Sequence, residues 1–174
     1  MEQGHPELIA ALDGVRKADD LDQVIGVVVD ALEAPLQLWH ASLVVVVPEQ
    51  GVARMLAAWS RTDSVFETGT EIALSISTKI EQAVRILGDG DAVIIDMGGG
   101  GGSLVDHLMQ QQGVTSALGI PVSARSYLFV LVLGGSDTSI LRELGKAFCL
   151  EVSDLLAEPL ERLPLTQSGY VGPR

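Results

Sequence analysis

An unbroken apolar run at Tyr127–Leu133 constrains the fold more than any other feature of the sequence. Seven consecutive apolar or aromatic residues predict a β-strand that is covered on both faces. Such a strand lies in the interior of a sheet, with further layers above and below it. The surrounding segment, Gly113–Ser136, predicts two strands joined by a short turn.

The composition predicts one soluble domain. The chain has 174 residues, of which 47% are hydrophobic, and this is enough for a single core. Its 11 basic and 23 acidic residues give a net charge of −12, which argues against direct binding to nucleic acid. Cys149 is the one cysteine, so no intrachain disulfide forms. Because neither a signal peptide nor a membrane-spanning apolar run is present, we expect a cytoplasmic protein with no membrane contact.

Hydrophobic periodicity and turn residues predict a mixed order of helices and strands. We expect an α+β fold with a central, mostly antiparallel sheet of five or six strands. The terminal helices are expected to pack together on one face of this sheet. The short helices and a glycine-rich loop remain for the other face. The predicted elements of the first half are a helix near Leu8–Val15, a helix from Leu21 to Pro35, a hairpin of Ser42–Val47 and Val52–Ser60, and a short strand at Thr70–Leu74. A helix from Thr78 to Gly88, a strand at Ala92–Asp96 and a helix from Ser103 to Gly113 follow. The chain then forms the hairpin of Gly113–Ser136 and a long final helix from Asp137 or Thr138, which Pro159 and Pro164 interrupt.

Several local phrases support this order. They are DDLDQVIGVVVDALEA from Asp19, ASLVVVVPEQGVARMLAAWS from Ala41, DAVIIDM from Asp91, and GVTSALGIPV from Gly113 followed by YLFVLVLGG. The order and these phrases resemble a GAF domain, a small-molecule sensor fold related to PAS. Many GAF domains carry the pattern G-x-x-S-x-L-x-x-P that Gly113–Pro121 matches. The resemblance covers roughly residues 19–158, with an N-terminal helical segment at 1–18 and a C-terminal tail at 159–174.

The glycine run is the candidate ligand-binding segment. It comprises Asp96, Gly98, Gly99, Gly100, Gly101, Gly102 and Ser103, between a predicted strand and a predicted helix. Backbone N–H groups at a helix N-terminus can hold an anion. No lysine follows as in a phosphate-binding P-loop, so these residues favour a flexible loop. The alternative is a lid that touches a ligand, because the resemblance implies that this segment borders a ligand pocket.

No catalytic, metal or cofactor site is predicted. The spacing of His5, His40 and His107 matches no metal site, and no nucleophile–base pair can be assembled. Pigment-carrying GAF domains attach a bilin to a cysteine that usually precedes a histidine, whereas Leu150 follows Cys149. Sulfoxide-reducing relatives use several cysteines. We therefore expect a protein that is not an enzyme, and the sequence leaves its cofactor unassigned.

These observations predict a non-catalytic GAF-like sensor or signalling module with a possible small-molecule ligand. Its expected partner is a second copy of the chain or another protein, bound through the terminal helices. The alternative is an accessory or interaction subunit of a larger complex that keeps the fold without a ligand.

Overall fold

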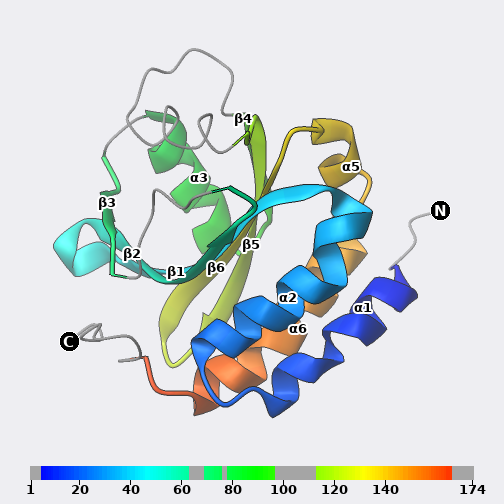
Figure 1. Cartoon of the computed structure of the whole chain (residues 1–174). Coiled ribbons are helices and arrows are strands. Elements are labelled where there is room, and N and C mark those ends of the chain that lie inside the picture. Colours follow the sequence, from blue (N-terminus) through cyan, green and yellow to red (C-terminus); the bar gives the residue numbers. More distant parts are fainter. Residues whose placement is uncertain (1–4, 63–68, 76–77, 97–112, 166–174) are drawn as a thin grey trace.

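The protein is built around a six-stranded sheet in the order β3-β2-β1-β6-β5-β4 (Figure 1). The computed structural model describes residues 5–62, 69–75, 78–96 and 113–165. Every pair of neighbouring strands is antiparallel, which agrees with the predicted α+β class. The strands are β1 (Leu38–Val47), β2 (Val52–Ser60), β3 (Glu71–Ala73), β4 (Val93–Asp96), β5 (Ser116–Ala124) and β6 (Tyr127–Gly135).

Strands β1 and β6 form the centre of the sheet. All residues of β1 except Trp39 are buried, and Phe129, Val130 and Leu131 of β6 are buried on alternating faces. The prediction that Tyr127–Leu133 is an interior strand is therefore confirmed. Strands β5 and β6 are joined at Arg125 and Ser126, whose φ angles of 53° and 65° suit a two-residue hairpin turn.

The terminal helices cover one face of the sheet, as the sequence predicts. This layer contains α1 (Pro6–Leu12), the 3₁₀ helix η1 (Asp13–Lys17), α2 (Leu21–Leu36), α5 (Thr138–Arg142) and α6 (Gly145–Arg162). Helix α2 begins after Asp20, whose carboxylate accepts a hydrogen bond from the Gln23 N–H at 2.8 Å. Helices α2 and α6 share one large core with the sheet, to which Leu32 and Phe148 contribute fully buried side chains.

The final helical segment differs from its prediction. It is divided, because α5 ends at Arg142 and α6 begins at Gly145, which has a φ of +78° that suits glycine. Helix α6 then continues through Pro159 to Arg162, although a proline inside a helix removes a hydrogen bond. Pro159 and Leu160 are both buried, and we attribute the continuation to this burial.

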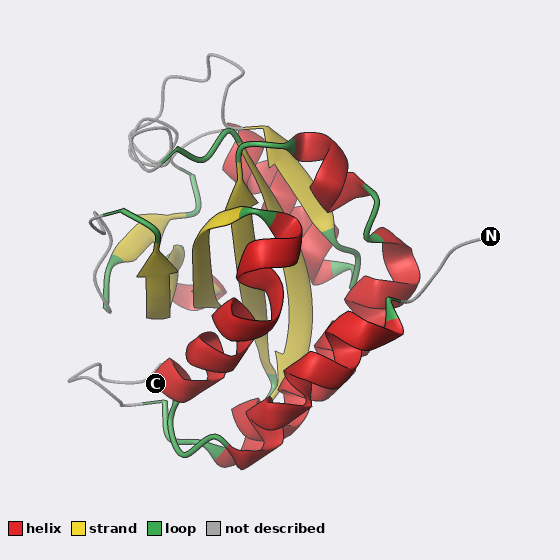
Figure 2. Cartoon of the chain, turned by 45° about the vertical axis from the view of Figure 1, so that its right-hand side comes forward, coloured by secondary structure: helices red, strands yellow, loops and turns green. Residues whose placement is uncertain are grey.

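Helix α3 (Thr78–Gly88) covers the opposite face of the sheet and buries Ala83 and Leu87. Helices therefore lie in front of and behind the strands in Figure 2. The predicted helix at Ser103–Gly113 falls almost wholly outside the described residues. Within the described ranges, no helix is both long and apolar enough to cross a lipid bilayer.

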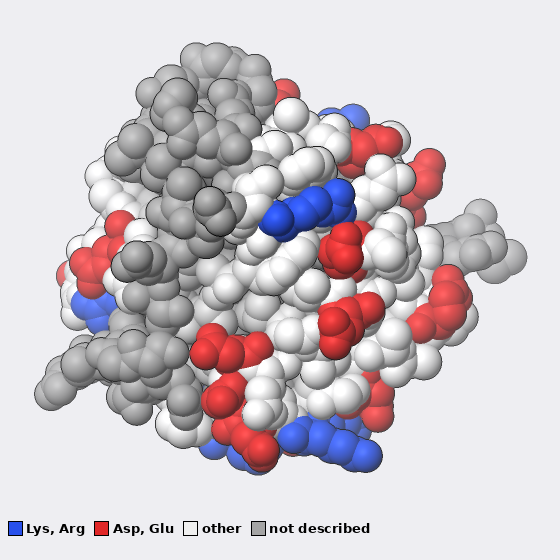
Figure 3. Space-filling view, in the orientation of Figure 1, with Lys and Arg blue, Asp and Glu red and all other residues white. Residues whose placement is uncertain are grey.

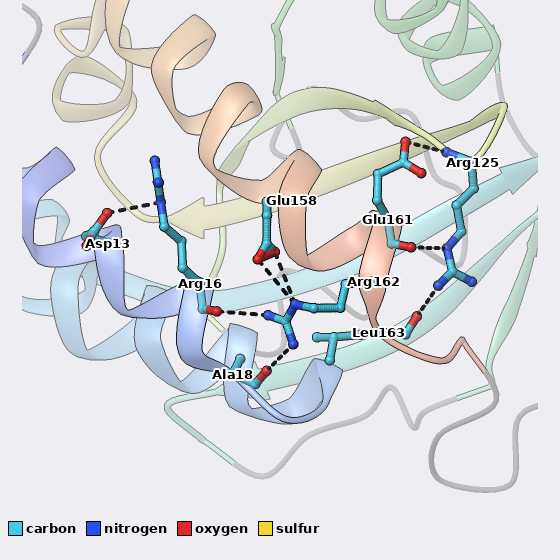
Figure 4. Close-up of polar contacts among 8 residues, drawn as sticks. All are labelled: Asp13, Arg16, Ala18, Arg125, Glu158, Glu161, Arg162 and Leu163. Carbon is cyan, nitrogen blue, oxygen red and sulfur yellow. Dashed lines mark hydrogen bonds and ion pairs between the residues drawn. The ribbon is translucent and has the colours of Figure 1, made fainter.

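Two arginines fasten the end of α6 to distant parts of the chain (Figure 4). Arg162 donates hydrogen bonds to the backbone carbonyls of Arg16 and Ala18, each at 3.0 Å, and pairs with Glu158 at 3.2 Å. In the β5–β6 turn, the Arg125 guanidinium donates to the carbonyls of Glu161 at 3.0 Å and Leu163 at 2.8 Å. These bonds satisfy carbonyl groups that a helix end leaves without an internal donor.

The Arg162 contacts can be tested by substitution. Replacing Arg162 with methionine keeps the aliphatic stem and removes the hydrogen bonds to η1 and its flanking residue, so we expect the free energy of unfolding to fall by about 1–3 kcal/mol. Urea denaturation measures the change. Arg85→Met is the matched control, because Arg85 is exposed and has no partner among the described residues; it should change stability by less than about 0.5 kcal/mol. Equal effects of the two variants would contradict this account.

Candidate ligand-binding cavity

The two faces of the sheet differ in the size of their side chains. In β5, Leu118 and Ile120 point toward α2 and α6, whereas Ala117 and Gly119 point toward α3. In β6, the side chains alternate in the same way. Its large residues Phe129, Leu131 and Leu133 enter the helical core, and its smaller residues Val130 and Val132 face α3. In β5 and β6, the α3 face is therefore built from smaller side chains than the helical face, while Met55 of β2 and Ile95 of β4 are larger residues on the same side.

A cavity of about 110 Å³ lies between this small-residue face and α3. Its wall comes from all six strands and from α3, so segments far apart in the sequence meet there. The described residues that line it are Ser42, Val44, Val46, Ala53, Met55, Ile72, Leu74, Ile80, Ala83, Val84, Leu87, Ile95, Ala117, Gly119, Val130 and Val132.

The described wall of the cavity is almost entirely apolar. Ser42 is the one hydroxyl-bearing residue among its described members, and it is buried. Its Oγ shares a hydrogen bond of 2.9 Å with Nε2 of His40, which is also buried. An apolar cavity of about 150 Å³ in another protein stays dry and binds benzene or xenon. The cavity here is thus suited to a small apolar molecule.

The predicted site residues are only partly described. Asp96 ends β4 next to Ile95, which lines the cavity, but the Asp96 side chain is exposed and is not part of the described wall. Its backbone carbonyl accepts a hydrogen bond from Lys79 in the first turn of α3. Gly98, Gly99, Gly100, Gly101, Gly102 and Ser103 lie outside the described residues, so their role in ligand binding stays a prediction.

The described histidines and the cysteine have different surroundings. His5 packs edge-on against Phe148 with ring centroids 5.7 Å apart, and His40 lies beside Ser42; His107 is outside the described residues. Cys149 is buried in the helical core, on the other side of the sheet from the cavity. Among the described residues, no group of three or more His, Cys, Asp or Glu side chains is arranged to hold a metal ion.

Comparisons with known proteins identify the fold. No protein-family model and no curated protein sequence matches the chain. Solved structures do match. The GAF domain of a two-component sensor histidine kinase from Bacillus halodurans is 15% identical with a TM-score of 0.58, and the match covers 83% of this chain and 92% of that one. The phycocyanobilin-bound GAF domain of a cyanobacterial phytochrome is also 15% identical, with a TM-score of 0.60 and coverage of 97% and 99%.

An enzyme is among the similar structures. The free methionine-R-sulfoxide reductase from Neisseria meningitidis, solved in complex with its substrate, is 15% identical with a TM-score of 0.58; the match covers 90% of this chain and 86% of that one. The chain described here therefore has the GAF fold, as the sequence predicts, and this fold is shared by proteins with different activities.

The cavity makes a prediction about packing. Replacing Ala117 with valine adds two carbons on the cavity side of β5, so we expect the free energy of unfolding to change by less than about 1 kcal/mol or to rise. Ala124→Val adds the same atoms on the other face of the same strand, where Ala124 is buried in the helical core. It should destabilise the protein by about 1–3 kcal/mol through overpacking. Urea denaturation of both variants measures the difference, and equal losses would mean that the cavity is not available space.

Proposed function

We propose that the chain is a non-catalytic GAF-fold sensor or signalling module that recognises a small, largely apolar molecule in the cavity between the sheet and α3. The apolar cavity on the small-residue face is the observation that carries this proposal. Burial of apolar ligand surface supplies the binding free energy in such a site. The glycine run Gly98–Gly102 remains the proposed lid, since it follows in the sequence from the strand that contributes Ile95.

The size and chemistry of the cavity favour a small ligand over a pigment. Some similar structures hold bilins, but a linear tetrapyrrole has several times the volume of the 110 Å³ described here. Cys149, the one thiol available for pigment attachment, lies on the other side of the sheet. A single cysteine that is buried in the helical core also argues against thiol-based sulfoxide reduction.

The central strands offer a route from ligand to surface. Val44 of β1 lines the cavity, and its neighbour Leu43 points into the helical core. In β6, Val130 likewise lines the cavity, and its neighbour Leu131 points into the helical core. If β1 and β6 can take two positions, a ligand that binds one of them more tightly would favour that position and so shift the packing of α2 and α6. A ligand that binds both positions equally would cause no shift.

An accessory subunit without a ligand is the second candidate. The observation that favours it is the lack of converging polar groups in the described wall, where the Ser42 hydroxyl is already bonded to His40. Specific ligand sites usually contain a few placed polar groups.

A benzene titration distinguishes the ligand-binding sensor from the accessory subunit. We expect a benzene titration followed by methyl NMR to shift the signals of Val44, Val130 and Val132. Ala117→Val should abolish these shifts, while Ser123→Val, an exposed position in the same strand, should retain them. An unchanged spectrum of the unsubstituted protein would favour the accessory subunit. Native mass spectrometry of protein from its own host would then identify any natural occupant.

The terminal helices remain the proposed partner surface, with a second copy of the chain as the first candidate. Carboxylates of Asp13, Glu151 and Asp154 flank a groove between α1 and α6, in which Arg16 is the one described cation. Acidic side chains are also scattered over the face that α1 and α2 form (Figure 3). A symmetric dimer through this surface brings like charges together, which weakens association at low ionic strength.

This arrangement predicts an unusual salt dependence. We expect self-association at tens of micromolar to increase when the salt concentration rises from about 0.05 to about 0.5 M, because salt screens repulsion between exposed carboxylates. Sedimentation velocity measures the dimer fraction. The double substitution Glu151→Gln with Asp154→Asn should raise that fraction at low salt. A strict monomer under all conditions would contradict the homodimer and leave a different protein as the partner.

A further inference from the structure

A second hollow lies on the helical side of the sheet, between β4 and the α5–α6 segment. Its volume is about 370 Å³, which falls within the range of small-molecule sites. It exists because α6 packs on β5, while β4 lies one strand further out at the edge of the sheet. Ile94 of β4, which packs at the margin of the helical core, is consequently only partly buried. No described residue lines both this groove and the cavity beneath α3.

The walls of this β4–α6 groove are largely apolar. Ile94, Leu118, Pro121 and Leu141 contribute to them. At the rim, Leu150 is 52% exposed, more than any other large apolar residue in the described part of the chain. A ligand with an apolar body would cover Leu150 and the open face of β4 at once.

Two positive charges line the same groove. Arg142 and Lys146 have neither an ion pair nor a hydrogen bond from their side chains to any described residue. By contrast, the side chains of Arg54, Arg61 and Arg162 each pair with a carboxylate. Arg85 also has no carboxylate partner among the described residues, but it does not line this groove, whereas Arg142 and Lys146 do.

The remaining polar groups of the groove are few. Asp91, Ser153 and the buried thiol-bearing residue Cys149 also line it, so its described charged groups are two cations and one carboxylate. Gly145 and Lys146, the first residues of α6, belong to the wall as well, and the first turn of a helix adds a positive potential. The groove thus combines an apolar surface with an excess of positive charge.

We propose that the β4–α6 groove binds a small amphipathic carboxylate. Its apolar body would lie on Ile94, Leu118 and Leu150, and its carboxylate would pair with Arg142 and Lys146. The two cations can bind the carboxylate of such a molecule, and the apolar wall can bind its apolar body. A neutral apolar molecule would make no ion pair with Arg142 or Lys146. This site is independent of the cavity beneath α3 and of the function proposed for it.

Octanoate is a suitable probe, with octanamide as its neutral counterpart. In an NMR titration of the full chain, we expect octanoate to shift the signals of Ala92, Ile94, Leu118 and Leu150. The double substitution Arg142→Gln with Lys146→Gln should weaken octanoate binding by roughly tenfold, the sum of two partly exposed ion pairs. Octanamide should bind the unsubstituted protein as weakly as octanoate binds this variant.

The matched control removes the same charge elsewhere. Lys17→Gln with Arg85→Gln lowers the net charge equally, at exposed cations that do not line the groove, and should leave octanoate binding unchanged. If both double variants weakened octanoate binding equally, the effect would come from the net charge of the protein, and the proposal would be overturned. Equal affinity for octanoate and octanamide would also overturn it. Octanoate shifts confined to Val44, Val130 and Val132 would place the ligand beneath α3, contradicting the groove while supporting the cavity.

Discussion

Burial of the β1–β6 pair on both faces is the constraint on which the rest of the structure depends. Phe129, Leu131 and Leu43 are fully buried against the helices, while Val44 and Val130 are buried toward α3. Each such side chain contributes about 1.5–3 kcal/mol on removal from water, so exposure of either face would be strongly unfavourable. Two covering layers are therefore required, and the terminal helices and α3 supply them.

The two layers are not equivalent, and their difference locates the candidate site. Large side chains on the helical side interdigitate with α2 and α6 into one continuous core. On the other side, β1, β5 and β6 present alanine, glycine, serine and valine toward α3, and a cavity remains. At the edge of the sheet, incomplete cover by α6 leaves β4 with a second, charged hollow. One site thus follows from side-chain size and the other from helix placement.

The sequence predicts the layers better than the sites. Long apolar strands and amphipathic helices are local signals, so the central strand Tyr127–Leu133 and the helix that begins at Leu21 could be recognised from neighbouring residues alone. The cavity depends on Ala83, Ala117 and Val44 meeting across the fold, which no local pattern specifies. The alternation of small and large residues in Ala117–Ile120 is the one local trace of it in β5. Likewise, Pro159 predicts a helix end by local rules, yet burial carries the helix past it.

The central claim is that the layer between the sheet and α3 contains unfilled apolar space that a ligand can occupy. A crystal structure determined under xenon pressure tests this claim most directly, because xenon enters dry apolar cavities without needing a polar partner. We predict a xenon atom in contact with Val44, Ala117 and Val130, with no change in the positions of β1 and β6. Side chains that close the space, with no xenon beneath α3, would contradict the account.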